Sequence, residues 1–333
     1  MNLHREARYR HAHYNTRRHF LRTCLSGLGA LTLQSFLGPL PGISGAEESG
    51  DPKLPHFLPR AKHVIYLHMA GAPSQLELFD YKPELQKLDG RYCPPSLFEG
   101  KQFAFIKERP QMLGPQAHFR RYGQSGAWVS EYLPHFSKVV DEVCFLKAVH
   151  TDEFNHAPAQ FLMHTGAPRT GRPSMGSWVT YGLGSPNENL PGFVVLVSRG
   201  TPSAGKRVWG SGFLPSIHQG VQCRSKGDPI LNLPNPAGVD RPLRKQSIDI
   251  INQINELEYQ ESGDPETLTR IGQYELAFKM QASVPDVMYI DDEPDYIKEL
   301  YGVTPGEVSF ANNCLLARRL VEKGVRFVQL YDR

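Results

Sequence analysis

The segment that decides the fold class is Phe310-Ala-Asn-Asn-Cys-Leu-Leu-Ala-Arg-Arg-Leu-Val-Glu-Lys-Gly-Val-Arg-Phe-Val-Gln-Leu-Tyr331. Residues 310–323 are predicted to form a helix, and Gly324 follows at the position where helices commonly end. The run from Val325 to Tyr331 is rich in apolar and aromatic side chains, which predicts a buried strand. A helix that leads through one glycine into an apolar strand is typical of α/β proteins.

Three more apolar runs upstream have the length and composition of strands. They are His63–Met69, Val143–Val149 and Phe193–Val197. Helices are predicted between the last two, at Pro158–His164 and Ser174–Tyr181. Strands that alternate with helices indicate a largely parallel sheet that is covered by helices on both faces.

The rest of the chain gives weaker signals. Helical spacing of apolar residues, interrupted by Pro134, predicts a helix over Trp128–Val140. Residues 198–240 contain many Gly, Pro and Ser residues, so we expect a loop-rich insertion there. A helical section follows at about 241–323, in which Asp264-Pro265 is typical of a helix start, with aspartate as N-cap and proline in the first turn.

The first 46 residues have the pattern of a twin-arginine signal peptide. Residues 1–22 contain six arginines against one glutamate, a net charge of +5, and residues 23–46 contain no charged side chain. The basic part includes Thr16-Arg17-Arg18-His19-Phe20-Leu21-Arg22, which resembles the motif that the twin-arginine export machinery reads. We therefore expect cleavage after Ala46, a leader at 47–62, and a protein of the periplasm or cell surface. The alternative is a membrane anchor, for which the apolar stretch is marginal in length.

Removal of this segment changes what the composition indicates. The whole chain has a formal net charge of +3, so the residues after the signal carry −2. This charge excludes a global basic surface for nucleic acid. The apolar content of 40% is sufficient for a packed core. No other stretch is long and apolar enough to predict a membrane span.

A loop dense in metal-binding side chains follows the strand predicted at 143–149. It contains His150, Asp152, Glu153, Asn155 and His156. Open α/β sheets bind ligands beyond the carboxyl ends of their strands, where this loop is expected to lie. Imidazole and carboxylate groups are donors that zinc and other transition metals accept, and a histidine there could act as a general base. The alternative is a solvated loop whose Asp and Asn side chains cap the next helix.

Other polar residues are candidates with stronger structural alternatives. Ser74 and Asp80 follow the strand at 63–69, but Ser74 with Glu77 has the spacing of a capping box. Arg172 could bind an anionic substrate group, because a guanidinium suits phosphate or sulfate. Ser174 is better explained as a helix cap. The single histidines His164 and His218 are expected to be structural.

Four segments together carry a family resemblance. They are Met69-Ala-Gly-Ala-Pro-Ser-Gln-Leu-Glu-Leu-Phe-Asp-Tyr-Lys-Pro83, Asn155-His-Ala-Pro-Ala-Gln-Phe-Leu-Met-His-Thr-Gly166, Gly171-Arg-Pro-Ser-Met-Gly-Ser-Trp178 and Val325-Arg-Phe-Val-Gln-Leu-Tyr331. From about residue 63 onward, the chain resembles the exported bacterial family called domain of unknown function 1501, of the planctomycete type. The resemblance implies the alkaline phosphatase and sulfatase superfamily, hence a doubly wound α/β fold. It also implies metal-dependent hydrolysis of phosphoric or sulfuric esters, with zinc, calcium or manganese, on a sulfated or phosphorylated carbohydrate.

The sequence also departs from the pattern of that superfamily. The alignment places His156 at the sulfatase nucleophile and Gln160 at an arginine, and the first strand ends in Ala70-Gly71 where a metal-binding aspartate is usual. Members of the family usually continue past the last strand into a Trp-Asp-His-His segment. The resemblance therefore implies that residues 63–333 are the N-terminal part of an alkaline phosphatase-like domain, inactive as a fragment.

Two functional hypotheses follow. The first is a metal-dependent hydrolase that acts outside the cytoplasm. Its candidate residues are His156 and Ser74 for catalysis, Arg172 and Asn155 for substrate binding, and His150, Asp152, His156 and Asp80 for the metal. The second is a non-catalytic superfamily member that serves as a binding or assembly component in the periplasm or at the cell surface. The dense loop at 150–156 favours the first, and the altered positions His156, Gln160 and Gln75 favour the second.

Overall fold

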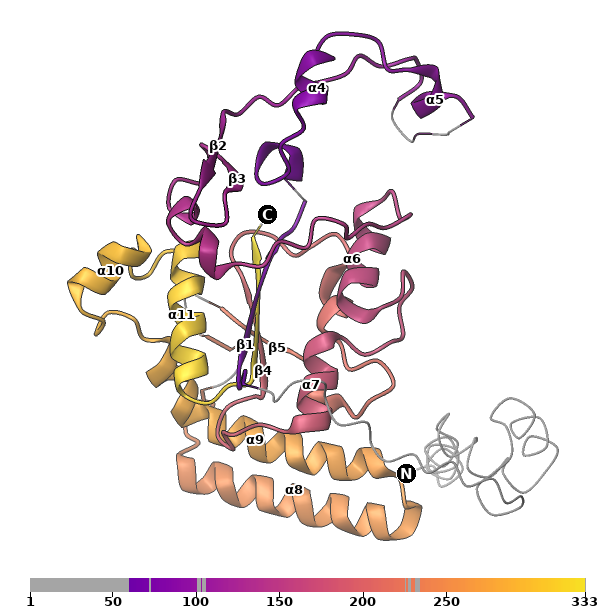
Figure 1. Cartoon of the computed structure of the whole chain (residues 1–333). Helices are drawn as coiled ribbons and strands as arrows, with labels where there is room; N and C mark the ends of the chain where they lie inside the picture. Colours follow the sequence, from indigo (N-terminus) through magenta and orange to yellow (C-terminus); the bar gives the residue numbers. More distant parts are fainter. Residues whose placement is uncertain are drawn as a thin grey trace, which may run out of the picture. The chain divides into compact units, whose positions relative to one another are not determined.

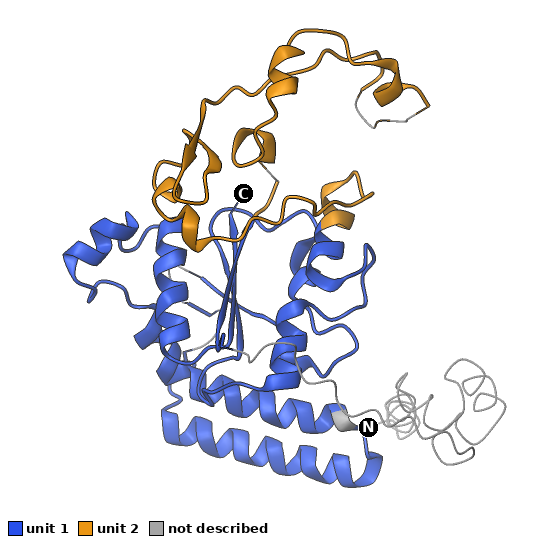
Figure 2. Cartoon of the chain, viewed as in Figure 1, with its two compact units in different colours: residues 1–68, 160–333 blue, residues 69–159 orange. Residues whose placement is uncertain are grey.

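The computed structural model describes residues 60–332 except 72, 101–102, 104–105, 225, 227–228 and 231–233. The signal peptide predicted at 1–46 lies outside the described residues. No helix in the described part of the chain is long and apolar enough to cross a membrane. The chain divides into two compact units, which Figure 2 shows in different colours. Unit 1 contains residues up to 68 and residues 160–333, and unit 2 contains residues 69–159.

Unit 1 is built on a four-stranded sheet with the strand order β1-β6-β4-β5. The strands are β1 (Val64–Met69), β4 (Phe193–Val197), β5 (Val221–Cys223) and β6 (Phe327–Asp332) (Figure 1). Strand β4 pairs in parallel with both β5 and β6, and the register sets Val197 opposite Tyr331. On the other side of β6, the Val64 amide donates to the Arg326 carbonyl at 2.9 Å, which joins the first strand to the last. The predicted α/β class with a mostly parallel sheet is confirmed.

Helices pack on both faces of this sheet (Figure 1). Helix α7 (Met175–Leu183) packs closely on β4, because a Cβ atom added at Gly176 would lie 2.6 Å from the Phe193 ring. The other face forms the main apolar core with α9 (Pro265–Met288) and α11 (Phe310–Glu322). Its buried side chains include Val194, Leu196, Val328 and Leu330 from the sheet and Leu315, Leu316 and Leu320 from α11. Alternate residues of each strand therefore serve different helix layers.

The predicted helical section consists of four helices in the described chain. They are α8 (Arg241–Ser262), α9, α10 (Asp295–Tyr301) and α11. Helices α8 and α9 lie side by side and are joined by Gly263 at φ +64° and Asp264 (Figure 1). The Asp264 Oδ1 atom accepts from the Glu266 amide at 3.0 Å, so the predicted N-cap is confirmed. Within the insertion at 198–240, the short helices η5 (Gly205–Trp209) and η6 (Ser216–His218) and strand β5 form where only loops were predicted.

Unit 2 contains short elements around a two-stranded antiparallel hairpin. The strands are β2 (Phe119–Tyr122) and β3 (Ala127–Ser130), and the helices are η2 (Gln75–Glu77), α4 (Pro83–Lys87), α5 (Pro95–Phe98), η3 (Phe136–Lys138) and η4 (Val140–Glu142). The helix predicted over 128–140 is wrong. Gly123 and Gly126 take positive φ angles in the turn, which lets Trp128 pair with Arg121 across the hairpin.

The strand predicted at 143–149 is also wrong. This run has no ladder partner among the described residues, and Leu146 and Val149 are 75% and 65% exposed. Phe145 anchors the segment, since its ring lies 5.5 Å from that of Phe79 and 6.0 Å from that of Phe136. A β-rich composition forms a strand only where a neighbouring strand can pair with it.

Candidate functional site

Polar side chains lie at the C-terminal ends of the parallel strands of unit 1. We call this edge of the sheet the carboxyl edge. His68 lies near the end of β1, Ser198 follows β4, and Asp332 ends β6. The His68 and Tyr331 rings lie 5.4 Å apart, which brings the ends of β1 and β6 together. Ligands of open α/β sheets bind at such an edge, so it is the first place to look for a functional site.

A buried network of three side chains lies on the sheet face that packs against α6 (His156–Thr165). Gln329 and Tyr331 are two positions apart on β6 and therefore point to the same face, toward His164 in the last turn of α6. The Gln329 amide donates to His164 Nδ1 at 3.2 Å and to the Tyr331 hydroxyl. Tyr331 Oη also lies 3.3 Å from His164 Nε2. We call His164, Gln329 and Tyr331 the buried network.

The groups of the buried network are uncharged at neutral pH. Burial, and then the charge of nearby His68, lowers the pKa of His164 to about 3. Burial likewise raises the pKa of Tyr331 above its ordinary value. Because the Gln329 amide faces Nδ1, the neutral imidazole carries its proton on Nε2 and donates it to Tyr331 Oη. A base with so low a pKa is a poor proton acceptor near pH 7, so the network is suited to holding β6 against α6.

His68 is the more available imidazole at this edge. It is partly buried, and its ring packs against the rings of His164 and Tyr331 at 4.8 and 5.4 Å. No hydrogen bond to its ring nitrogens is formed within the described chain. Burial lowers its pKa, which favours the neutral form that can accept a proton or bind a metal.

Oxygen atoms without partners lie on the other face of the same edge. Asn313 of α11 is 1% exposed and donates through Nδ2 to Ser198 Oγ at 3.0 Å, which leaves its Oδ1 atom buried without a hydrogen bond. Asp332 Oδ1 is buried and unpartnered as well. The Ser198 amide bonds to the Tyr331 carbonyl at 2.9 Å, so Ser198 extends the β4–β6 register to Asp332. The Asp332 carboxylate also affects Cys314. Burial, and secondarily the negative charge of Asp332, raises the pKa of the Cys314 thiol to about 11.

The residues predicted as a metal-binding loop lie in unit 2. His150, Asp152 and His156 are exposed, and Asn155 Oδ1 accepts from the Ala157 amide at 3.5 Å near the start of α6. Asp80 pairs with Lys82 at 2.9 Å. Within the described parts of the chain, no three His, Cys, Asp or Glu side chains converge as a metal site would require. The strand that placed this loop at a carboxyl end does not form, so its role stays a prediction.

The other candidates have structural partners. Ser74 Oγ accepts from the Leu76 amide at 3.3 Å as the N-cap of η2. The predicted capping box is incomplete, because Glu77 Oε2 accepts from the amides of Gln116 and Ala117 instead. Ser174 is buried and caps α7, as expected. The Arg172 side chain is exposed in unit 1.

The sequence prediction missed the residues that the carboxyl edge brings together. His68, Asn313, Gln329 and Asp332 were not identified, whereas the structural role expected for His164 agrees with its place in the buried network. Gln329 could have indicated part of this group from the sequence, because it is a polar residue between apolar residues of β6. Such a residue needs a buried partner on the face that it shares with Tyr331.

The fold and this edge define the chain as a mixed α/β protein with polar groups collected at the ends of parallel strands. A family model described as "Protein of unknown function (DUF1501)" matches residues 61–333, so the chain belongs to that family. The family resemblance of the four sequence segments is thereby confirmed. A comparison with curated proteins found no match, and a comparison with solved structures found none either.

Proposed function

We propose that this protein is an exported, metal-dependent hydrolase of phosphate or sulfate esters with an alkaline phosphatase-like fold. The observation that supports this most is the pair of buried oxygen atoms, Asn313 Oδ1 and Asp332 Oδ1, at the carboxyl edge. Both belong to residues at the place where such folds bind their ligands. Neither atom has a hydrogen-bond partner in the described structure.

A buried carboxylate oxygen without a partner is energetically unfavourable, at a cost of about 1–3 kcal/mol or more for a charged group. A bound cation removes this cost, and carboxylate and amide oxygens are the ligands that calcium, magnesium and manganese prefer. Asp332 and Asn313 therefore suit a divalent metal, which would be completed by further donors. Such a metal, when bound, supplies positive charge that stabilises the oxygens of an ester in the transition state.

The test combines metal binding with hydrolysis. The thermal unfolding midpoint of the full chain is measured in EDTA and in calcium, manganese or zinc, beside turnover of p-nitrophenyl phosphate and p-nitrophenyl sulfate. We expect at least one metal to raise the midpoint, because a ligand of the folded state stabilises it. Asp332→Asn should weaken metal binding about 10-fold or more. In EDTA the same variant should be at least as stable as the parent, because the cost of an unpartnered buried charge has been removed.

The control is Asp295→Asn, which changes an aspartate of α10 that is fully exposed and pairs with Lys298 at 3.5 Å. This variant should bind metal as the parent does. If Asp332→Asn and Asp295→Asn respond alike to every metal, the carboxyl edge holds no metal and the proposal is wrong.

The second candidate is a superfamily member without catalysis that binds a ligand or assembles a larger structure. The observation that favours it concerns the two positions that align with sulfatase catalytic residues. His156 is exposed at the start of α6, and Gln160 Oε1 accepts from the Ala204 amide at 3.0 Å, which ties the loop after β4 to α6. The Gln160 side chain therefore has a structural role. Binding of either p-nitrophenyl ester without any dependence on metal would favour this candidate.

A further inference from the structure

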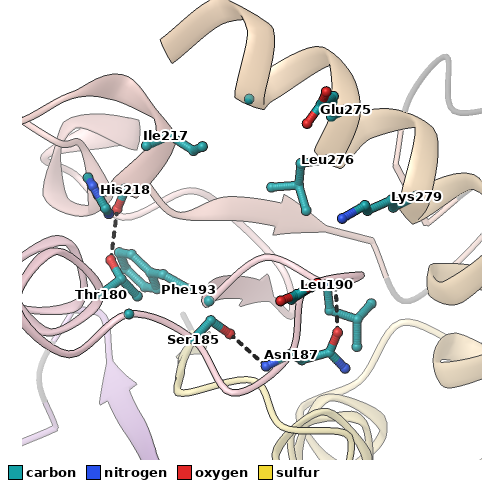
Figure 3. A pocket seen from close by; sticks show the side chains of 14 residues that line it. Thr180, Ser185, Asn187, Leu190, Phe193, Ile217, His218, Glu275, Leu276 and Lys279 are labelled. Atoms are coloured by element: carbon teal, nitrogen blue, oxygen red, sulfur yellow. Dashed lines mark hydrogen bonds between the residues drawn. The ribbon is translucent and has the colours of Figure 1, made fainter. Parts of the chain in front are cut away.

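An open pocket lies at the opposite end of unit 1, beside the start of β4. Its volume is about 320 Å³. Leu190, Phe193 and Leu276 supply apolar surface, while Lys279 extends into the pocket from α9 and His218 lies across from it (Figure 3). The Thr180 hydroxyl donates to the His218 carbonyl at 3.4 Å, which fixes α7 to η6 at the pocket wall.

The polar groups of this pocket carry both signs of charge. Glu188 and Glu275 provide two carboxylates and Lys279 one ammonium group. Glu275 and Lys279 are four residues apart on α9, yet neither side chain has an ion-pair or hydrogen-bond partner within the described chain. Burial lowers the pKa of His218, so its neutral ring offers one donor and one acceptor. These groups can bond to hydroxyls, which both donate and accept.

A row of aromatic rings leads away from the pocket over the surface of α7. We call Phe213, Trp178, Tyr181 and His218 the aromatic row. Successive ring centroids lie 5.6, 6.2 and 5.3 Å apart, in edge-to-face arrangements. The exposed fractions of Trp178, Tyr181 and Phe213 are 46%, 53% and 59%, although large aromatic side chains usually bury most of their surface. His218 belongs to both the row and the pocket, so the two form one continuous surface.

The backbone holds this row in place without a ligand. Trp178 and Tyr181 are three residues apart on α7 and therefore share one face of the helix. The loop that carries Phe213 is tied to the start of α7, because the Ser174 amide donates to the Gly210 carbonyl at 3.0 Å. Gly212 has φ +59°, and a Cβ atom there would lie 2.4 Å from the Arg172 backbone. This fixed geometry reduces the entropy that a ligand would lose by ordering the site.

We propose that the aromatic row and the pocket together bind a neutral saccharide chain. The apolar faces of sugar rings would stack on Trp178 and Tyr181, and sugar hydroxyls would bond to Glu275, Lys279 and His218. A sugar presents an apolar face and a polar rim at once, which matches a surface where half-exposed rings adjoin unpaired polar groups. This site does not depend on the carboxyl edge or on any hydrolysis.

Charge decides against other ligand classes. A nucleic acid or a heavily sulfated glycan would bring many negative charges toward Glu188 and Glu275, against one Lys279. A neutral, hydroxyl-rich ligand does not have this conflict.

The experiment is a calorimetric titration of the full chain with neutral hexasaccharides of glucose, xylose, mannose and N-acetylglucosamine, which measures the affinity for each. We expect at least one of them to bind, and Trp178→Ala and Tyr181→Ala to weaken that binding about tenfold. Both side chains are about half exposed, so both variants should fold. The matched control is Tyr296→Ala, which removes an exposed aromatic ring on α10. Affinity should change little between about 50 and about 200 mM salt, whereas polyanion binding falls steeply over that range.

Three outcomes would overturn the proposal. The first is that none of the four hexasaccharides binds. The second is that binding occurs but is the same in Trp178→Ala as in the parent. The third is self-association of the parent that Trp178→Ala abolishes, which would make the aromatic row a contact between copies of the chain.

Discussion

The Oη atom of Tyr331 lies 3.3 Å from Nε2 of His164, although 167 positions separate the two residues in the sequence. The contact joins the last strand of the sheet to the last turn of α6 and is buried. Since His164 is 2% exposed and Tyr331 fully buried, the protonation of one imidazole is coupled to the packing of the whole face.

Stability should therefore fall in mild acid through His164. The folded state holds the pKa of His164 at about 3, whereas an unfolded histidine has a pKa of about 6.5. The unfolded chain thus binds the extra proton, so this contribution to stability is complete above about pH 6.5 and is lost as pH falls toward 3. It amounts to at most about 4–5 kcal/mol. Urea unfolding at a series of pH values measures it, and His164→Gln should flatten the curve.

The control for this pH dependence is His135→Gln, since His135 is exposed and its ring forms no helix-cap bond. That variant should keep the slope of the parent. A parent protein whose free energy of unfolding is constant between about pH 7 and about pH 4 would contradict the assignment.

Tyr331→Phe should destabilise the fold by about 1–3 kcal/mol. The substitution keeps the ring but removes the hydroxyl that accepts from the Gln329 amide and from His164, which leaves two buried donors without an acceptor. Tyr289→Phe is the matched control, because Tyr289 is 57% exposed. Equal midpoints of denaturant unfolding for the two variants would show that the buried network contributes no stability.

Two glycines of α7 should respond oppositely to alanine. A Cβ atom at Gly176 would lie 2.6 Å from the Phe193 ring, so Gly176→Ala should push the helix from β4 and cost about 1–3 kcal/mol. At Gly182 an added Cβ atom meets nothing within 4 Å, so Gly182→Ala should be neutral or stabilise by up to about 1 kcal/mol. Thermal unfolding of the pair is the measurement. Destabilisation by both would point to helix backbone effects instead of close packing.

Export should depend on Arg17 and Arg18, which match the motif that the twin-arginine machinery reads. Replacement of both by lysine keeps the charge and should leave the precursor in the cytoplasm. The control replaces Arg8 and Arg10 by lysine and should be exported normally. Fractionation of cells and immunoblotting distinguish the two, and normal export of the Arg17/Arg18 variant would indicate a different route.

The strands show how far sequence can predict this fold. The runs at 63–69, 193–197 and 325–331 were identified because apolar β-formers mark buried strands, and all three pair in one sheet. The burial predicted for the first run is wrong, since β1 lies at the edge of the sheet with Ile65 and Leu67 exposed. The run at 143–149 has a similar composition but no partner strand, and pairing depends on residues far away in the chain. Local pattern therefore identifies candidates for a strand, while the sheet selects among them.

The carboxyl edge was beyond local reasoning for the same reason. Its groups come from β1, α6, α11 and the ends of β4 and β6, so no short motif contains two of them apart from Gln329, Tyr331 and Asp332 on β6. The local cluster at 150–156 was the stronger motif, yet its His and Asp side chains lie exposed. A high density of donors in sequence does not by itself make them converge in the fold, and no three such side chains converge within the described residues.

The hydrogen bond between Val64 and Arg326 also constrains the order in which the strands of the sheet can pair during folding. Strand β1 is made first on the ribosome, but its partner β6 emerges only some 260 residues later. Contacts of such separation slow folding, since a long loop must close before they form. Until then β1 has no strand beside it, and unpaired strand edges of incomplete folds are natural targets for chaperones. Closure of the sheet is thus a late step of folding, which can begin only after β6 has left the ribosome, and an interruption of synthesis before β6 would leave β1 without its partner.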